Sequence, residues 1–190
     1  PNQRILLLMP ASRPQEIRYI LPIFMKTAKK LQLRYPNLIV YIPSCRRAFD
    51  ESFKKALKKY QVKGQVISQK DNAKLKPYIY SVTELALCKS GTVNMELALY
   101  DIPQIVGYRV SRFTAFIAKK ILNFKIRFIS PVNLLVKRRL VPEFVQKDLD
   151  EKKIFNKACK ILERRSEKIK IKKGYALLKK ELGEQGVVKR

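Results

Sequence analysis

The chain has 190 residues, the length of one domain with a small appendage. It carries 42 lysine and arginine side chains against 15 acidic ones, a net charge of +27, which indicates an anionic partner such as a phospholipid or a nucleotide. It contains no histidine, which excludes histidine-dependent triads and histidine metal ligands within these residues. No apolar run approaches the roughly 20 residues that a membrane-spanning helix needs.

Two further features of the composition narrow the classes of protein. The three cysteines are widely spaced and form no C-x-x-C pair, so neither a disulfide framework nor a zinc site is indicated, and a reducing compartment is expected. The basic residues are spread along the whole chain and do not form a terminal tail. We therefore expect no metal and no nucleic acid partner.

The chain opens with a continuous apolar run, Ile5-Leu6-Leu7-Leu8-Met9, which predicts a strand buried on both faces of a parallel sheet. The next residues predict a turn into a helix, because Ser12 as N-cap and Gln15 fit an S-x-x-Q capping box. This helix is expected to end near Tyr35, where Pro36 follows.

The segments that follow alternate between strand and helix patterns. Strands are expected at residues 38–42, 65–68, 85–88 and 104–108, and helices at 47–59, 75–82 and from the turn at 89–92 to near 100. This alternation predicts an α/β protein with a doubly wound, Rossmann-like parallel sheet. Residues 1–147 are expected to form that domain, and residues 148–190 a Lys-rich helical extension with two helices in a solvated outer layer.

The turn Lys89-Ser90-Gly91-Thr92 lies where a predicted strand ends and a helix begins. The backbone N–H groups of Ser90, Gly91 and Thr92, with the positive end of the helix dipole, predict a phosphate site at this edge of the sheet. The alternative is that Ser90 and Thr92 only cap an ordinary strand-to-helix connection. Glu96, one helical turn further on, is placed to reach a sugar hydroxyl.

Two later segments have less regular patterns. Phe113, Phe116 and Phe124 recur at helical spacing among lysines and arginines, which indicates a basic amphipathic segment. Such a segment either packs on the sheet or on an absent domain, or it contacts a membrane surface. Further on, the residues from Leu140 to Phe144 are expected to start another helix.

Several ordered blocks of the sequence resemble one known family. They are Lys89-Ser90-Gly91-Thr92-Val93-Asn94-Met95-Glu96-Leu97-Ala98-Leu99, Pro103-Gln104-Ile105-Val106-Gly107-Tyr108-Arg109, Pro131-Val132-Asn133-Leu134-Leu135 and Leu140-Val141-Pro142-Glu143. The opening Leu8-Met9-Pro10-Ala11-Ser12-Arg13 is similar to the family's Pro-Gly-Ser-Arg turn, with Ala11 in place of the glycine. Together they resemble the lipid-A-disaccharide synthases, family-19 glycosyltransferases, and most of all their cyanobacterial and plastid branch.

The resemblance implies a GT-B fold of two Rossmann-like domains, of which this chain is the carboxyl-terminal, donor-binding one. It implies transfer of 2,3-diacylglucosamine from its UDP donor to 2,3-diacylglucosamine 1-phosphate, giving a β-1,6 disaccharide and UDP. No metal or other cofactor is expected. The implied location is the cytoplasmic surface of the inner membrane, or the stromal side of a plastid. The acceptor site and the catalytic base are expected in the absent amino-terminal half, so this chain alone is expected to be inactive.

The same resemblance implies a set of donor-binding residues: Ser12, Arg13, Ser90, Gly91, Thr92, Glu96, Tyr108 and Asn133. Arg13 is expected at the pyrophosphate and Glu96 at the ribose. Their alternatives are an ion pair of Arg13 with Glu16 or Glu96, and a solvated carboxylate at Glu96. Asn133 is expected at the nucleotide or donor sugar, or else in an Asx turn.

The resemblance also assigns the acyl chains and an anionic membrane surface to Phe113, Phe116 and Phe124. Two other functions stay open from the residues. One is a related GT-B glycosyltransferase that transfers from a UDP-sugar to a lipid. The other is a non-catalytic, truncated module that binds nucleotide or anionic lipid.

Overall fold

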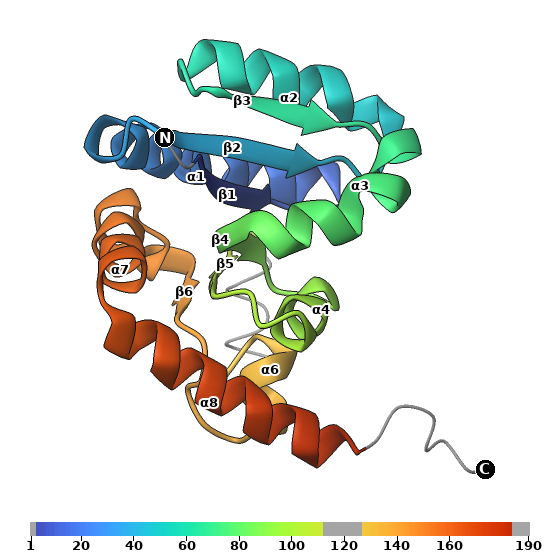
Figure 1. Cartoon of the computed structure of the whole chain (residues 1–190). Coiled ribbons are helices and arrows are strands. Elements are labelled where there is room, and N and C mark those ends of the chain that lie inside the picture. Colours follow the sequence, from blue (N-terminus) through green and yellow to red (C-terminus); the bar gives the residue numbers. More distant parts are fainter. Residues whose placement is uncertain (1–2, 112–126, 184–190) are drawn as a thin grey trace, which may run out of the picture.

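The computed structural model describes residues 3–111 and 127–183, which form a parallel sheet with helices on both faces (Figure 1). The sheet has six strands in the order β3-β2-β1-β4-β5-β6, and every neighbouring pair is parallel. The strands are β1 (Arg4–Met9), β2 (Leu38–Pro43), β3 (Gly64–Ile67), β4 (Thr83–Lys89), β5 (Gln104–Tyr108) and β6 (Glu143–Val145). The predicted Rossmann-like α/β fold is confirmed.

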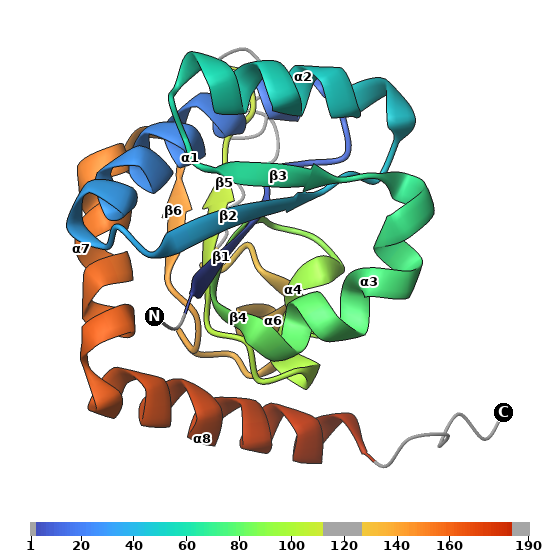
Figure 2. The same ribbon diagram turned by 45° about the horizontal axis from the view of Figure 1, so that its top comes forward.

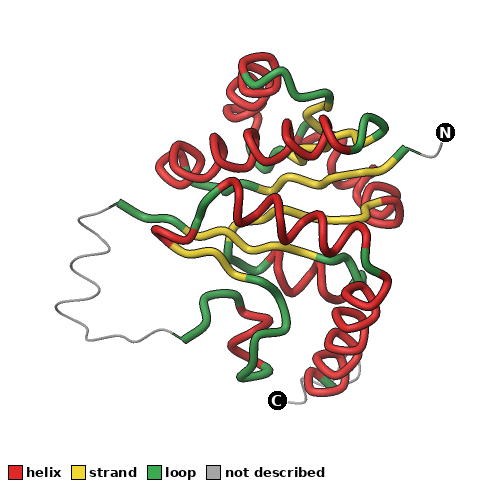
Figure 3. The backbone as a smooth tube through the Cα atoms, turned by 90° about the vertical axis from the view of Figure 1, so that its left-hand side faces the viewer, coloured by secondary structure: helices red, strands yellow, loops and turns green. Residues whose placement is uncertain are grey.

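The helices wrap both faces of this sheet, as the tube view makes clear (Figure 3). They are α1 (Pro14–Arg34), α2 (Arg47–Lys59), α3 (Gln69–Val82), α4 (Val93–Leu99), α6 (Pro131–Leu135), α7 (Glu151–Glu163) and α8 (Arg165–Leu182), with a 3₁₀ turn at Gln146–Asp148. α1 packs against α2 and α7 on one face, while α3 and α4 lie on the other (Figures 1 and 2). Within the described residues, no helix is both long and apolar enough to cross a membrane.

The central strands explain why the apolar runs in the sequence are continuous. Leu6, Leu7 and Leu8 of β1 are completely buried, because β1 has strands on both sides and helices on both faces. β1 pairs with β2 on one side and with β4 on the other. The order of the strands therefore reverses between β1 and β4, and in such sheets the loops after these two strands diverge and leave a crevice for a ligand.

α3 is longer than the sequence predicts, since it begins at Gln69 and not near residue 75. Its start is set by Ser68, whose Oγ accepts a hydrogen bond from the Asp71 backbone N–H at 3.2 Å and donates one to Asp71 Oδ2 at 2.7 Å. This local capping stabilises the first turn of a segment whose apolar pattern is weak.

The predicted N-cap of α1 is wrong. The helix begins at Pro14 with Arg13 as its N-cap, and no side-chain hydrogen bond caps it, so the expected box between Ser12 and Gln15 does not form. The Ser12 hydroxyl consequently has no partner among the described residues, although it lies beside the crevice between β1 and β4.

The helix predicted to start at Leu140 is also wrong, because the chain forms β6 there. Val106 of β5 pairs with Glu143, and the Val106 N–H donates to the Pro142 carbonyl at 2.9 Å. The Glu143 carboxylate accepts hydrogen bonds from the backbone N–H groups of Ile129 and Ser130 at 3.0 and 2.8 Å. These long-range bonds fix an extended conformation that the local sequence does not specify.

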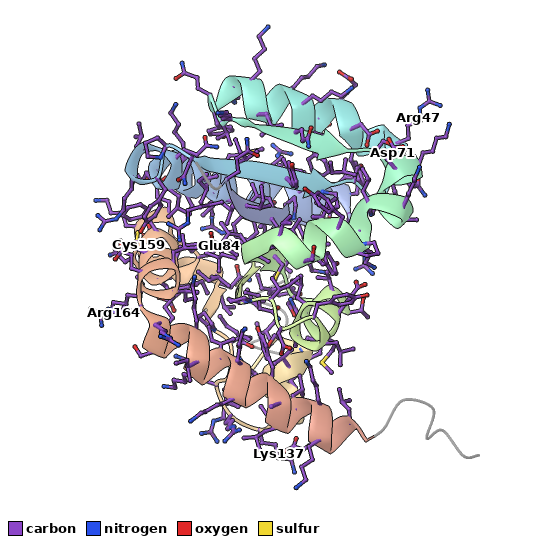
Figure 4. All side chains as sticks on the ribbon, in the orientation of Figure 1. Arg47, Asp71, Glu84, Lys137, Cys159 and Arg164 are labelled. Carbon is purple, nitrogen blue, oxygen red and sulfur yellow. The ribbon has the colours of Figure 1, made fainter. Side chains whose placement is uncertain are left out.

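The helices α7 and α8 belong to the same hydrophobic core as the sheet, and are not the solvated layer that their lysines suggest. Buried side chains on these two helices are Ile154, Ala158, Cys159, Ile161, Leu162, Ile171, Tyr175 and Leu178. At the amino edge of the sheet, Glu84 pairs with Arg4 at 2.9 Å and with Lys168 of α8 at 3.4 Å. Figure 4 shows Glu84 and Cys159 there, and Arg47 and Asp71 at the opposite edge, where β2 and β3 end.

Candidate functional site

A hollow of about 260 Å³ opens at the carboxyl edge of the sheet, between the loops that follow β1 and β4. It is lined by Met9, Pro10, Ala11, Ser12, Pro43, Cys45, Lys89, Ser90, Gly91, Thr92 and Val93. We call it the switch-point hollow. Met9, the last residue of β1, pairs with Cys88, the residue before the end of β4, so the turns that follow these two strands lie together at one edge of the sheet.

A second, wider hollow of about 620 Å³ lies beside it, and we call it the outer hollow. Its lining residues are Arg13, Pro14, Gln15, Glu16, Tyr19, Tyr108, Arg109, Val110 and Ser111. The start of α1 therefore separates two concave surfaces, with Ser12 on the first and the exposed Arg13 on the second.

The backbone amides of the 89–92 turn are not all available to a ligand. The Ser90 N–H donates to the Gly107 carbonyl at 3.3 Å, and the Gly91 N–H donates to Asn94 Oδ1 at 2.8 Å. Thr92 and Val93 have no backbone N–H partner among the described residues. Of the three predicted amide donors, Thr92 alone is left without a partner among the described residues, and Val93 adds a donor that the sequence analysis does not name.

Asn94 holds this turn in place from inside the protein. Its side chain is completely buried, and its Nδ2 lies 3.2 Å from both the Lys89 carbonyl and Cys88 Sγ. The Asn94 carbonyl accepts from Gln104 Nε2 at 2.9 Å, and the same nitrogen lies 3.2 Å from the hydroxyl of Tyr175 on α8. A chain of buried hydrogen bonds thus runs from α8 to the Gly91 amide.

Replacing Asn94 with alanine is expected to destabilise the chain by about 2–4 kcal/mol. The substitution leaves the Gly91 N–H and the Lys89 carbonyl without their partner and opens a void in a buried position. Urea denaturation followed by circular dichroism measures this loss. Asn156→Ala, at an exposed position of α7, is the matched control, and its free energy of unfolding is expected within about 0.5 kcal/mol of the unaltered chain. Equal stabilities of the two variants would contradict the structural role of Asn94.

An ion pair that the sequence does not predict lies between the two hollows. Lys89 Nζ lies 2.8 Å from Glu16 Oε1 and 6.0 Å from the centre of the Tyr108 ring. The two charged side chains are 21% and 12% exposed, and the other Glu16 oxygen is buried without a partner among the described residues. The signal in the sequence was a lysine directly before the small-residue turn, but its partner on α1 becomes visible only in the fold.

The predicted ribose ligand, Glu96, lies away from both hollows. Its carboxylate forms an ion pair with Lys76 of α3 and approaches the Tyr80 hydroxyl. Burial raises the pKa of Tyr80, and the negative charge of Glu96 raises it further. The alternative ion pairs of Arg13 are not formed, because Glu96 pairs with Lys76 and Glu16 with Lys89. The ribose role of Glu96 stays a prediction.

Asn133 is completely buried and fully hydrogen-bonded within the protein. Its Oδ1 accepts from the backbone N–H groups of Leu140 and Val141 at 2.7 and 2.8 Å, and its Nδ2 donates to the Val141 carbonyl and to Glu143, both at 2.8 Å. This amide fastens α6 to β6 and has no free donor or acceptor in this conformation. Its contact with a nucleotide or sugar also stays a prediction.

Of the remaining predicted positions, one lies at a hollow and three lie outside the described residues. Tyr108 lines the outer hollow, whereas Phe113, Phe116 and Phe124 lie outside the described residues. Within residues 3–111 and 127–183, no group of three or more cysteine, aspartate or glutamate side chains is arranged to hold a metal ion.

Known proteins are similar to this chain both in sequence and in fold. A family model described as lipid-A-disaccharide synthetase matches residues 1–190. The lipid-A-disaccharide synthase of Prochlorococcus marinus is 46% identical over 190 residues, which are 100% of this chain and 48% of that protein. The chain spans about half the length of the curated relatives it matches.

Two solved structures have the same fold at low sequence identity. MnaA of S. aureus in complex with UDP matches with a TM-score of 0.64 and 11% identity, over 91% of this chain and 41% of that one. WaaG, a glycosyltransferase involved in lipopolysaccharide biosynthesis, matches with a TM-score of 0.59 and 13% identity, over 97% of this chain and 44% of that one. With the match of the family model over its whole length, the chain belongs to the lipid-A-disaccharide synthetase family.

Proposed function

We propose that this chain is the donor-binding half of a lipid-A-disaccharide synthase. In the complete enzyme it binds UDP-2,3-diacylglucosamine and presents the sugar to 2,3-diacylglucosamine 1-phosphate, and the products are the β-1,6-linked disaccharide and UDP. The observation that supports this most directly is the switch-point hollow, at the edge of the sheet where α/β folds of this order bind their ligands, in a chain that the family model matches throughout.

The lining of the switch-point hollow suits a nucleotide diphosphate. The backbone N–H groups of Thr92 and Val93 and the hydroxyl of Ser12 are donors with no partner among the described residues, and negative oxygens are their natural acceptors. A leaving UDP gains negative charge as the glycosidic bond to it breaks, so fixed donors at this place lower the energy of the transition state. We propose that this step uses no metal ion.

The other half of the proposed function concerns the lipid substrates. Acylated donor and acceptor are held in a membrane, so we propose that the complete enzyme works at an anionic membrane surface as a peripheral protein, on the cytoplasmic side of a bacterial inner membrane or the stromal side of a plastid. The high positive charge of the chain supports this location. Phe113, Phe116 and Phe124 are the proposed acyl-chain or membrane contacts.

The chain carries its own reporter for nucleotide binding. Cys45 lines the switch-point hollow and is exposed, whereas the other two cysteines, Cys88 and Cys159, are buried. Alkylation by iodoacetamide is therefore expected at Cys45 first, and saturating UDP is expected to slow it several-fold because the nucleotide covers the thiol. Intact-protein mass spectrometry over time measures the rate.

The controls for this experiment separate a specific from a general effect. CDP and ADP at the same concentration are expected to protect Cys45 less than UDP, and Cys45→Ser is expected to remove the fast phase of labelling. An unchanged rate of alkylation at millimolar UDP, with no heat of binding in calorimetry, would overturn the proposal that this hollow binds the donor nucleotide.

A further inference from the structure

Lys89 Nζ lies beside Glu16 and Tyr108, which line the outer hollow, but Lys89 also lines the switch-point hollow. Among the described residues that line it, Lys89 alone is charged, and the others are apolar, small or hydroxyl-bearing. Arg13, the cation that the sequence assigns to the pyrophosphate, is exposed and lines the outer hollow instead. The cationic contact for a ligand in the switch-point hollow therefore has to be sought at Lys89.

The environment of Lys89 orders its ammonium group without using up its hydrogen-bonding capacity. Glu16 Oε1 lies 2.8 Å from Lys89 Nζ, and only about a fifth of the lysine side chain is exposed. An ammonium has three donors, and this contact takes one of them. The Tyr108 ring, 6.0 Å away, adds a weak attraction to the same cation.

We propose that Lys89, oriented by Glu16, is the residue that contacts the diphosphate of the bound nucleotide, and that Glu16 acts as a positioning residue for it. This inference rests on the proposed function, since it assumes a nucleotide in the switch-point hollow. Lys89 directly precedes the turn whose Thr92 and Val93 amides have no partner in residues 3–111 and 127–183, so the ammonium and these amides serve one group of phosphate oxygens. The Glu16 carboxylate fixes the lysine but also lowers the net positive charge that the ligand meets.

The test compares ligands with and without the diphosphate. The affinities of UDP and uridine are measured by NMR titration for the unaltered chain, for Glu16→Gln and for the double variant Lys89→Met with Glu16→Gln. The double variant is preferred to Lys89→Met alone, because it does not leave the mostly buried Glu16 carboxylate without its cation. Lys172→Met, at an exposed position of α8, is a control for the loss of a lysine outside the hollow.

The expected result is a loss of affinity for UDP with no change in the affinity for uridine, which lacks the diphosphate. The double variant is expected to bind UDP at least about tenfold more weakly than the unaltered chain, and uridine equally well. Glu16→Gln is expected to bind UDP a few-fold more weakly and uridine equally well, because the ammonium stays but loses the contact that holds it in place. Lys89→Arg is expected to retain most of the affinity for UDP, because the guanidinium keeps a positive charge and hydrogen-bond donors. Lys172→Met is expected to change the affinity for neither ligand.

Two outcomes would overturn the inference and are distinguishable from each other. If the unaltered chain binds UDP and the double variant keeps the same ratio of UDP to uridine affinity, Lys89 does not contact the diphosphate, and the proposed function stands. If the unaltered chain binds neither ligand at millimolar concentration, the proposed function itself fails.

Discussion

Gly91→Val is expected to abolish detectable UDP binding while leaving the free energy of unfolding within about 0.5 kcal/mol of the unaltered chain. A Cβ atom built on Gly91 meets no heavy atom within 4 Å, and the backbone of Gly91 is not in the left-handed region that would demand a glycine. The fold therefore does not require glycine here. Because Gly91 lines the switch-point hollow, the space beside it is what a valine would fill.

The measurement pairs calorimetric titration with UDP and urea denaturation of the same preparation. The expected loss of affinity exceeds that of Gly91→Ala, because valine adds three carbon atoms to the hollow and alanine adds one. Gly64→Ala is the opposite control. Its Cβ would lie 2.3 Å from the Val40 carbonyl oxygen in the neighbouring strand, so it is expected to lower stability, in β3 and away from the hollow. A stable Gly91→Val variant that binds UDP normally would place the nucleotide elsewhere.

Above pH 9 the free energy of unfolding is expected to fall steeply, because several groups, Cys88 and Tyr175 among them, keep their protons in the folded chain. Burial raises the pKa of Cys88 to about 12, against the hydrogen bond from Asn94, which lowers it. Burial also raises the pKa of Tyr175 well above its usual value. In the unfolded chain these groups lose their protons near pH 8.5 and pH 10, so over this range the folded state binds more protons and stability falls as the pH rises.

The size of the effect follows from the same linkage. Each group contributes a slope of about 1.4 kcal/mol per pH unit while its unfolded form is ionised and its folded form is not, so the two together give roughly 2.5 kcal/mol per pH unit near pH 11. Urea denaturation at pH 8, 9, 10 and 11 is compared between the unaltered chain and the double variant Cys88→Ala with Tyr175→Phe. Titration of the many lysines is common to both proteins, so the difference between their slopes isolates the two buried groups. Parallel pH profiles would show that neither group titrates differently on unfolding.

The sequence predicts the parts of the fold that depend on local composition. The run Ile5–Met9 and the apolar stretches of β4 and β5 are continuous because these strands are buried on both faces, so their positions could be predicted to within about two residues. β6 could not. Its three residues are half-buried, and only their pairing with β5 makes them a strand.

The sequence predicts where the candidate site lies, but it does not predict which amide donors and which cation line it. Turn residues at the ends of two strands are visible in a sequence, and strand order then brings the two turns together. Which amides remain free depends on Asn94, whose side chain folds back to Gly91, and which cation lines the switch-point hollow depends on a contact between Lys89 and a different helix. Glu96 and Asn133 show the same dependence, since their partners come from distant segments.

Because the Tyr175 hydroxyl is hydrogen-bonded both to the Ile102 carbonyl and to Gln104, the carboxyl-terminal helix is a structural support of the switch-point hollow. A shortened version of this chain for ligand screening or crystallisation therefore has to keep α8 intact. Cutting after α7 would remove the phenol from the centre of a buried polar network and leave Gln104 facing an open void. The lysine-rich sequence of α8 suggests that the helix can be removed, but its buried face shows that the fold depends on it.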